Sequence, residues 1–335
     1  MTDTASARPR VLSGIQPTGS LHIGNYLGAL RNWVRDQDEF ENFFCIVDLH
    51  ALTVLPDPDA LRTNTLEVAA LYLASGLDPA RCEIFVQSHV AAHTQLGWVM
   101  ECLTPMGWLE RMTQFKARSQ AQGRERVGTG YFTYPALMAA DILLYDADYV
   151  PVGDDQRQHL EFSRDVAQRL NSLRGDVVKV PAPLIRAVGA RIMGLDDPLI
   201  KMSKSVAVEK PAHAIAMLDP PDVIRRKISR AQTDAEPEVK APVGPGVGNL
   251  LDIYAALRNI DAKTALNEFF GKPYSVLKQA VAEALIAELE PVQRRFSELR
   301  RDETALGGVL EASADRVRVI ADATLLRVQR AVGLR

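Results

Sequence analysis

Hydrophobic and polar positions follow different patterns in the two halves of the chain. In the first half, short apolar runs are separated by longer segments whose apolar residues recur every three or four positions. The short runs predict β-strands at VLSGI (11–15), FFCIVDL (43–49), EIFVQ (83–87) and DADYVPV (146–152). The amphipathic segments predict helices over 21–37, 60–77 and 153–171. Such alternation is typical of a parallel sheet, which binds ligands beyond the carboxyl ends of its strands.

The remaining segments favour helices. Residues 104–146 have helical patterns that a polar stretch, 118–130, interrupts, and we expect this stretch to be a surface loop. From about residue 207 onward the strand signal fades. Further helices are predicted over 249–261, 263–271, 274–299 and 302–332. The pattern therefore predicts an α/β domain followed by an all-helical domain.

Composition and charge exclude several classes of protein. Of the 335 residues, 47% are hydrophobic, which supports a sizeable core and argues against disorder. A net charge of −3 argues against a protein that coats nucleic acid or membranes, although a local basic face for RNA stays open. Cys45, Cys82 and Cys102 form no C-x-x-C pair, so we expect neither a zinc cage nor a disulfide framework. No apolar run is long enough to span a membrane, and 1–10 is expected to be a flexible tail, which favours an intracellular protein.

The first strand-to-helix turn is a candidate phosphate site. The segment SGIQPTGSLHIGNYLGAL (13–30) leaves a strand, turns through 17–20 and begins a helix, whose free N–H groups favour anions. Gly24 lets a nucleotide approach the backbone, while His22 and Asn25 share a face and can both donate hydrogen bonds. The alternative is an ordinary turn with an incidental histidine. The segment is not G-x-G-x-x-G, so an NAD site is not supported.

A second candidate is a lysine-containing loop. Lys201 and Lys204 surround small or flexible residues and follow the turn-rich GLDDP (194–198). A mobile loop with two ammonium groups and two serine hydroxyls can wrap a polyphosphate and stabilise the charge on departing pyrophosphate. On its own, this segment could equally be a solvated surface loop.

The segment YFTYPALMAADILLY (131–145) is a candidate ligand pocket. Tyr134, Met138, Asp141 and Tyr145 are spaced so that they share one helix face. A carboxylate among so many apolar residues is costly without a partner. The face suits a flat apolar ligand with one N–H donor, such as an indole. The alternative is that Asp141 pairs with an Arg or Lys or caps another helix, with Tyr134 and Met138 as core residues.

Three other patterns favour ordinary structural roles. His89 and His93 are four residues apart but lack the H-E-x-x-H pattern, so we do not expect them to bind metal. Asp154 and Asp155 could suggest a metal site, but adjacent residues point apart on a helix, so we do not expect one. The glycines in 237–249 follow no strand, so a flexible connector is favoured over a phosphate loop.

The motifs together resemble a known family. HIGN (22–25) is similar to the HIGH signature of class I aminoacyl-tRNA synthetases, and KMSKS (201–205) is identical to their second signature. The chain resembles the bacterial tryptophanyl-tRNA synthetases from about residue 11 to 332, least in the C-terminal third and in 116–131. The segments that carry this resemblance are SGIQPTG, FFCIVDLHALTV, RMTQFKA, YPALMAADILLY, VPVGDDQRQHLE and GARIM. KMSKS is followed by Val-Ala where the family often has Asp-Pro.

The resemblance implies a fold and an activity. The fold is a Rossmann-type α/β catalytic domain over 11–205 with a helical insertion at about 104–146, followed by a helical anticodon-binding domain over 206–335. The activity is that of a tryptophan–tRNA ligase, which forms tryptophanyl-adenylate from L-tryptophan and ATP with Mg²⁺ and then charges tRNA(Trp). A cytoplasmic homodimer is implied, without zinc. The three scattered cysteines cannot hold the iron–sulfur cluster that some relatives have.

The resemblance also implies site residues. The catalytic positions are His22, Asn25, Lys201 and Lys204. The ATP-binding positions are Gln16, Pro17, Thr18, Gly24, Asn25, Gly153, Asp154, Asp155, Ile192, Lys201, Met202, Ser203, Lys204 and Ser205. The tryptophan-binding positions are Leu12, His50, Tyr134, Met138, Asp141, Val150, Val152 and Gln156, with Asp141 accepting the indole N–H. Leu12 stands where an aromatic residue can occur, and His22 where some relatives have Thr.

Three rival functions remain to be weighed. The tyrosyl enzymes are the nearest relatives, but their pocket needs groups that both donate to and accept from a phenol hydroxyl. A paralogue that binds tryptophan, ATP or RNA as a regulator is disfavoured by the intact signatures. A small adenylyltransferase is disfavoured by the C-terminal helices and the complete lysine motif.

Overall fold

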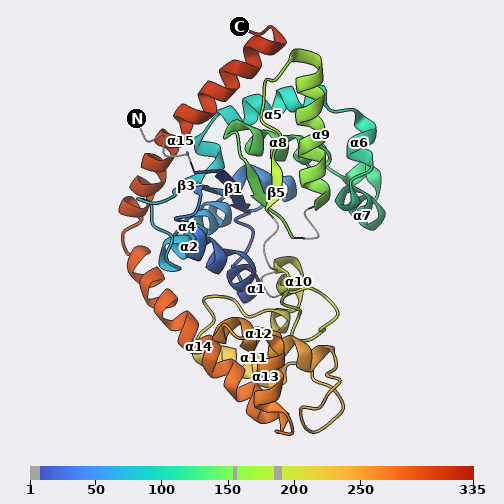
Figure 1. Ribbon diagram of the computed structural model, residues 1–335, viewed down its shortest axis with the longest axis vertical. Coiled ribbons are helices and arrows are strands. Elements are labelled where there is room, and N and C mark those ends of the chain that lie inside the picture. The colour runs from blue at the N-terminus through green and yellow to red at the C-terminus, as the bar shows by residue number, and fades with distance from the viewer. Residues whose placement is uncertain (1–7, 154–156, 185–190) are drawn as a thin grey trace, which may run out of the picture.

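A parallel five-stranded sheet forms the centre of the upper half of the molecule (Figure 1). The computed structural model describes residues 8–153, 157–184 and 191–335. The strand order is β3-β2-β1-β4-β5, and every neighbouring pair is parallel. The strands are β1 (Arg10–Ile15), β2 (Glu41–Ile46), β3 (Glu83–Val86), β4 (Tyr149–Pro151) and β5 (Ala182–Leu184). The first four confirm the predicted strands. β5 was not predicted, because three residues that include Pro183 give too weak a pattern.

Helices alternate with the strands along the chain and surround the sheet. The predicted helix over 21–37 is a continuous run of three elements, α1 (Ile23–Asn25), the π-helical η1 (Tyr26–Leu30) and α2 (Arg31–Asp36). The other helices of this part are α3 (Asp48–Ala51), η2 (Leu52–Val54), α4 (Pro58–Ala74), η3 (Gln87–His89), α5 (Ala92–Leu103), α6 (Met106–Glu110), α7 (Thr113–Gln122), η4 (Arg124–Arg126), α8 (Thr129–Leu144) and α9 (Arg157–Arg174).

The polar stretch 118–130 differs from the prediction. Its first residues belong to α7, and η4 follows, so the expectation of one surface loop was wrong. The helix was missed because it is almost entirely exposed and buries only Phe115, which leaves no apolar periodicity to detect.

The two faces of the sheet bury different helices. Alternate β2 side chains point to opposite faces, so Phe43 and Cys45 join one core while Phe44 and Ile46 join the other. The first core includes apolar residues of α5, α8 and α9, and the second includes those of the α1–α2 run and α4. Burial on both faces is the rule for parallel sheets. Among the described residues, helices thus cover both faces of the sheet, and the carboxyl ends of the strands are where such sheets bind ligands.

A helical group follows the sheet in the chain and lies below it in Figure 1. It comprises α10 (Lys204–Glu209), η6 (Pro211–His213), α11 (Pro221–Arg230), α12 (Pro245–Arg258), α13 (Ala262–Phe269) and α14 (Tyr274–Leu299). The four helices predicted after residue 249 are all present, the last as α15 (Glu303–Val332). None of the helices in the described part of the chain combines the length and apolarity that a membrane span requires.

The last helix leaves this group and returns to the sheet. Figure 1 shows α14 and α15 along one side of the molecule, with α15 beside β3. Val317 and Ala321 are fully buried in the core that also holds Leu12 and Phe85. The Ser313 hydroxyl accepts a hydrogen bond from the backbone N–H of Ile84 at 2.9 Å. α15 therefore belongs to the packing of the sheet, although we expected residues 206–335 to form one helical domain.

Candidate active site

Polar residues lie directly after two neighbouring strands of the sheet. His50 lies on α3, which begins two residues after β2, and Gln87 directly follows β3. Between the sheet and the lower helices, α1 and α10 approach each other (Figure 1). This is the edge where parallel sheets bind their ligands.

The first turn connects β1 to α1. Gly19 has φ +69°, a left-handed conformation that favours glycine. Leu21 and Ile23 are bonded to the segment before α11, because Met217 N donates to Leu21 O at 2.8 Å and Ile23 N to Ile215 O at 3.0 Å. The side-chain oxygen of Asn25 accepts from the backbone N–H of His22 at 3.2 Å. The turn is thereby held from both sides before any ligand binds.

The His22 imidazole is buried beside the glycine of the motif. Burial lowers the pKa of His22 to about 4, and the nearby positive charges of Lys204, His213 and Lys201 act in the same direction. The ring is therefore neutral at pH 7, and its Nδ1 has no partner within the described structure. A Cβ at position 24 would lie 2.9 Å from this ring, so Gly24 provides the space in which the imidazole sits.

The lysine motif begins on the second arm of a short hairpin and continues into α10. Met193 pairs antiparallel with Lys201, and Met202 N donates to Ile192 O at 3.1 Å. Ile192 and Met202 are buried in the core, which anchors the hairpin. The Ser203 hydroxyl then accepts from Val206 N and caps α10, as serine does at helix starts. Lys201 and Ser205 are exposed at the surface of this hairpin and helix.

Lys204 joins the two signature motifs. Its ammonium nitrogen donates to the backbone oxygen of Gln16 at 3.0 Å, across 188 positions of sequence. Burial lowers the pKa of Lys204 to about 8, partly opposed by the charge of Glu67. At neutral pH most of this lysine is still charged. A cation therefore lies at Gln16, the residue before the turn that the sequence predicted as a candidate phosphate site.

Asp141 lies in a buried polar network on α8. His50 Nε2 lies 2.7 Å from one carboxylate oxygen, and Gln87 Nε2 and His93 Nδ1 lie 2.7 Å from the other. Burial raises the pKa of Asp141, but charge and hydrogen bonds from His50 and His93 outweigh it, and the pKa lies well below its usual range. The carboxylate is thus ionised. Its partners are neither the Arg or Lys nor the helix cap that the sequence left open.

Sequence reasoning missed two members of this network. Nothing in the sequence singles out Gln87, and the spacing of His93 from His89 suggested only a weak metal pair. His93 is fully buried, and its Nε2 lies 2.8 Å from the Tyr145 hydroxyl. Over residues 8–153, 157–184 and 191–335, no group of three or more His, Cys, Asp or Glu side chains could hold a metal. Only the general rule that a buried carboxylate needs donors could have suggested these partners.

The other predicted positions differ in how far they are exposed. The Tyr134 hydroxyl is hydrogen-bonded to His159 Nε2 at 2.6 Å. The Tyr134 ring packs edge-on against the His50 ring, with centroids 6.2 Å apart. Leu12 and Val150 are buried, whereas Met138 and Val152 are half-buried. Pro17 is buried and Thr18 half-buried, while Gln16 and Gly153 are exposed. Asp154, Asp155 and Gln156 lie outside the described residues.

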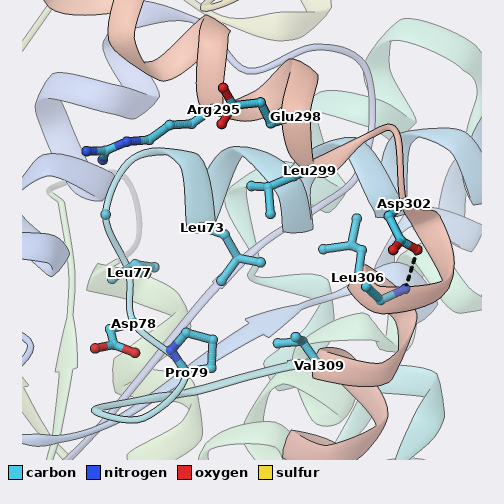
Figure 2. Close-up of a pocket in the computed structure, with 12 residues that line it drawn as sticks. Leu73, Leu77, Asp78, Pro79, Arg295, Glu298, Leu299, Asp302, Leu306 and Val309 are labelled. Carbon is cyan, nitrogen blue, oxygen red and sulfur yellow. Dashed lines mark hydrogen bonds between the residues drawn. The ribbon is translucent and has the colours of Figure 1, made fainter.

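A separate hollow lies away from this site. Figure 2 shows a pocket of about 590 Å³ between the end of α4 and the junction of α14 and α15, lined by residues that include Leu73, Leu299 and Leu306. It contains none of the predicted site residues. Its size alone gives it no part in the chemistry at the strand ends.

Comparisons with known proteins place the chain among characterised enzymes. The family profile described as tRNA synthetases class I (W and Y) matches residues 4–290. The tryptophan–tRNA ligase of Wolinella succinogenes is 51% identical over 328 residues, covering 98% of this chain and 99% of that protein. The corresponding ligase of Caldanaerobacter subterraneus subsp. tengcongensis is 49% identical over 327 residues, covering 97% and 98%.

Solved structures give the same grouping. The tryptophanyl-tRNA synthetase of Mycoplasma pneumoniae superposes with a TM-score of 0.90 at 36% identity and covers 98% of each chain. The Campylobacter jejuni enzyme, crystallised with ADP and tryptophan, has a TM-score of 0.83 at 32% identity, covering 97% of this chain and 99% of that one. A tyrosyl-tRNA synthetase from Archaeoglobus fulgidus, 22% identical with a TM-score of 0.68, shares the fold.

Proposed function

The chain belongs to the class I tRNA synthetases for tryptophan and tyrosine, and from this membership we infer that it is an ATP-dependent tryptophan–tRNA ligase. In the first step, a carboxylate oxygen of L-tryptophan attacks the α-phosphorus of ATP. The bond from that phosphorus to the bridging oxygen breaks, and pyrophosphate leaves. In the second step, a ribose hydroxyl at the 3′ end of tRNA(Trp), by family analogy the 2′ hydroxyl, attacks the activated carbonyl and AMP leaves.

The contact between Lys204 and Gln16 is the observation that carries this proposal. It brings the ammonium group of the second signature to 3.0 Å from the backbone oxygen of Gln16, which precedes the turn leading to the first signature. In phosphoryl and adenylyl transfer the protein mainly positions the reactants and stabilises developing charge. Lys201 and Lys204 would hold the departing pyrophosphate, while neutral His22 and the amide of Asn25 would donate to phosphate or ribose oxygens. No side-chain nucleophile is needed.

The nucleotide would lie along the strand ends. We assign the first turn to the ATP phosphates through Gln16, Pro17 and Thr18, with Gly24 behind them. Gly153 and Ile192 would contact the adenosine, and 201–205 would close over the phosphates. Asp154 and Asp155 belong to the same assignment, although they lie outside the described residues.

Asp141 supports tryptophan as the amino acid. An ionised carboxylate accepts hydrogen bonds and cannot donate one, which matches the donor-only indole N–H. His50, Gln87 and His93 hold its oxygens in fixed positions. We assign the surrounding walls to the indole ring, namely Leu12, Tyr134, Met138, Val150, Val152 and Gln156. A site built around one polar atom discriminates strongly against ligands that cannot satisfy it.

Mg²⁺ would enter with the nucleotide. Magnesium is commonly bound by substrate phosphates with few protein carboxylates, and no acidic cage is present in the part of the chain that the structure describes. When bound, the ion would neutralise phosphate charge. The protein's own contribution is the pair of lysines.

The RNA and the second subunit would use other surfaces. We assign the anticodon end of tRNA(Trp) to the helical group within 206–335, where Arg225 and Arg226 lie on an exposed face of α11. We place the dimer contact on 105–145 and adjoining α5, where Trp98 and Met106 are 66% and 64% exposed. A cytoplasmic location follows from a role in protein synthesis.

Charging of tRNA tests the assignment. With purified tRNA(Trp), ATP and labelled tryptophan, the protein is expected to form acid-precipitable tryptophanyl-tRNA, with tRNA(Tyr) as the matched control. Adenylate formation without any charging would instead indicate the regulatory paralogue. Charging of tRNA(Tyr) with tyrosine would contradict the inference.

A further inference from the structure

A buried histidine and an aspartate lie against the back of the lysine hairpin. His213 ends η6 and has no exposed surface. Its Nδ1 lies 2.5 Å from Asp196 Oδ1, and its Nε2 lies 3.2 Å from the backbone oxygen of Lys201. One imidazole thus touches the turn of the hairpin and the first lysine of the motif.

The two neighbours determine the proton content of the ring. A backbone carbonyl only accepts hydrogen bonds, and an ionised carboxylate does the same. With an ionised Asp196, both contacts are satisfied only when both ring nitrogens of His213 carry a proton. The carboxyl of Asp196 keeps 28% of its side-chain surface exposed, so it also contacts solvent.

The hairpin is built closely around this ring. A Cβ at position 194 would lie 2.2 Å from His213 Cε1, so only glycine lets the backbone approach so near. Leu195 N also donates to His213 O at 3.0 Å. On the first strand, Asn249 donates to Met193 O and accepts from Met193 N at 3.1 and 2.8 Å. The hairpin is thus fastened at both strands, by α12 and by His213.

We propose that His213 is a positioning residue for adenylate formation, which holds the backbone of Lys201 through its charged ring and thereby sets where both motif lysines meet the phosphates. This proposal rests on the proposed function. The groups that face His213 are the Asp196 carboxylate and the Lys201 carbonyl, and its charge also reaches His22. Loss of one ring proton would remove one of its two bonds and loosen the hairpin.

The protonation state can be observed without any activity assay. In the full chain labelled with ¹⁵N-histidine, the six histidines are few enough to assign His213 by comparison with H213Q. At pH 7 the wild-type ring is expected to show two protonated nitrogens, and in D196N one of them is expected to be lost. A neutral His213 ring in the wild type, with a single N–H, would overturn the proposal.

Kinetics of ATP–pyrophosphate exchange test the positioning role. H213A is expected to lower kcat about ten-fold, because the lysines act in the transition state, while KM for tryptophan stays within about two-fold. H213Q restores one donor to Lys201 and is expected to regain part of the rate. D196N removes the charge of the partner of His213 at a half-exposed position, where a change disturbs the core less than at His213. H89Q is the matched control and should match the wild type, since His89 ends η3 and its Nδ1 lies 3.6 Å from Glu311 on α15.

The outcomes separate this inference from the function on which it rests. No exchange by the wild type with any amino acid would reject the proposed function. Normal exchange by the wild type and an unchanged kcat in both folded H213A and D196N would reject only the role of His213. A loss in which KM for tryptophan rises together with a fall in kcat would also reject it, because the effect would then not be confined to the lysine hairpin.

Discussion

Asp141 is surrounded by donors before any ligand arrives. Both oxygens are engaged by His50, Gln87 and His93 at 2.7 Å, so the carboxylate is fixed in place as well as ionised. Each carboxylate oxygen has more than one acceptor site, which leaves room for one further N–H. In the proposed function, this arrangement converts a costly buried charge into a rigid recognition group.

Replacement of this carboxylate tests its role at the level of one residue. D141N keeps the shape of the side chain but removes its negative charge. It also places an amide NH₂, which is a donor, next to groups that donate to the carboxylate in the wild type. We expect KM for tryptophan in pyrophosphate exchange to rise about 10- to 100-fold, with KM for ATP little changed. The kinetic constants of the wild type and D141N, measured under the same conditions, check this. Equal values would show that Asp141 has no part in tryptophan binding.

Lys204 gives a prediction about pH. Because burial lowers its pKa to about 8, the folded chain loses this positive charge as pH rises through that value. In the exchange assay, kcat/KM for ATP is therefore expected to fall above about pH 8. The fall in kcat is expected at a higher pH, because bound phosphates stabilise the charged ammonium group. K204R keeps its charge and should lack this fall, and K204A should be slow at every pH. An alkaline limb that is unchanged in K204R would assign it to another group.

At the scale of elements, the run from α1 to α2 shows what periodicity predicts and what it does not. Apolar spacing located the helix over 21–37 closely. It did not reveal the π-helical turn η1, because apolar spacing does not distinguish one wide turn from the α-helix on either side. Within η1, the Tyr26 hydroxyl donates to Glu288 on α14 at 2.8 Å. π-turns are frequent at functional sites, and this one directly follows the signature residues.

Gly24 and Gly28 form a matched pair in this run. G24A would place a methyl group 2.9 Å from the His22 ring and displace the imidazole, whereas a Cβ at position 28 meets no atom within 4 Å. We expect G24A to lower exchange kcat/KM about 10- to 100-fold while G28A matches the wild type. Both changes favour helix formation, so thermal melting should show that neither variant is unfolded. An active G24A would mean that the position of the His22 ring does not matter.

Prediction of the site from sequence rests on local motifs and stops where contacts are long-range. HIGN, KMSKS and the helix face that carries Asp141 could be recognised in the sequence, because each lies within one short segment. His93 with Asp141, and His213 with Asp196, bring together residues that carry no local signal of their pairing. Which partner a buried polar group chooses depends on how whole helices pack, and one sequence does not contain that geometry in readable form.

At the scale of the whole molecule, α15 joins the C-terminal helical region to the sheet. The sequence predicted this helix as 302–332, close to its observed bounds, but an apolar stripe does not say which surface it covers. In the structure, Ala314, Val317 and Ala321 are fully buried in the core of the sheet, and Arg316 pairs with Glu83 on β3. The helical region is thus joined to the sheet both by the chain and by this packing.

Removal of α15 should therefore unfold more than a peripheral helix. A chain that ends at Asp302 would expose the β3 side of the sheet core, and we expect no cooperative melting and no pyrophosphate exchange. Because truncation is a large change, S313A provides a finer measure. It removes the acceptor for Ile84 N and should lower stability by about 1–3 kcal/mol in denaturant unfolding, with exchange kinetics unchanged. A cooperatively folding, active truncated chain would contradict this account of α15.

The central claim is that a cationic hairpin and the first turn hold a triphosphate beside a pocket with one fixed acceptor. Its most direct test is ATP–pyrophosphate exchange by the wild-type chain with each of the twenty amino acids in turn. The account predicts rapid exchange with tryptophan alone and tyrosine at a small fraction of that rate. Exchange with tyrosine equal to that with tryptophan, or no exchange with any amino acid, would contradict it.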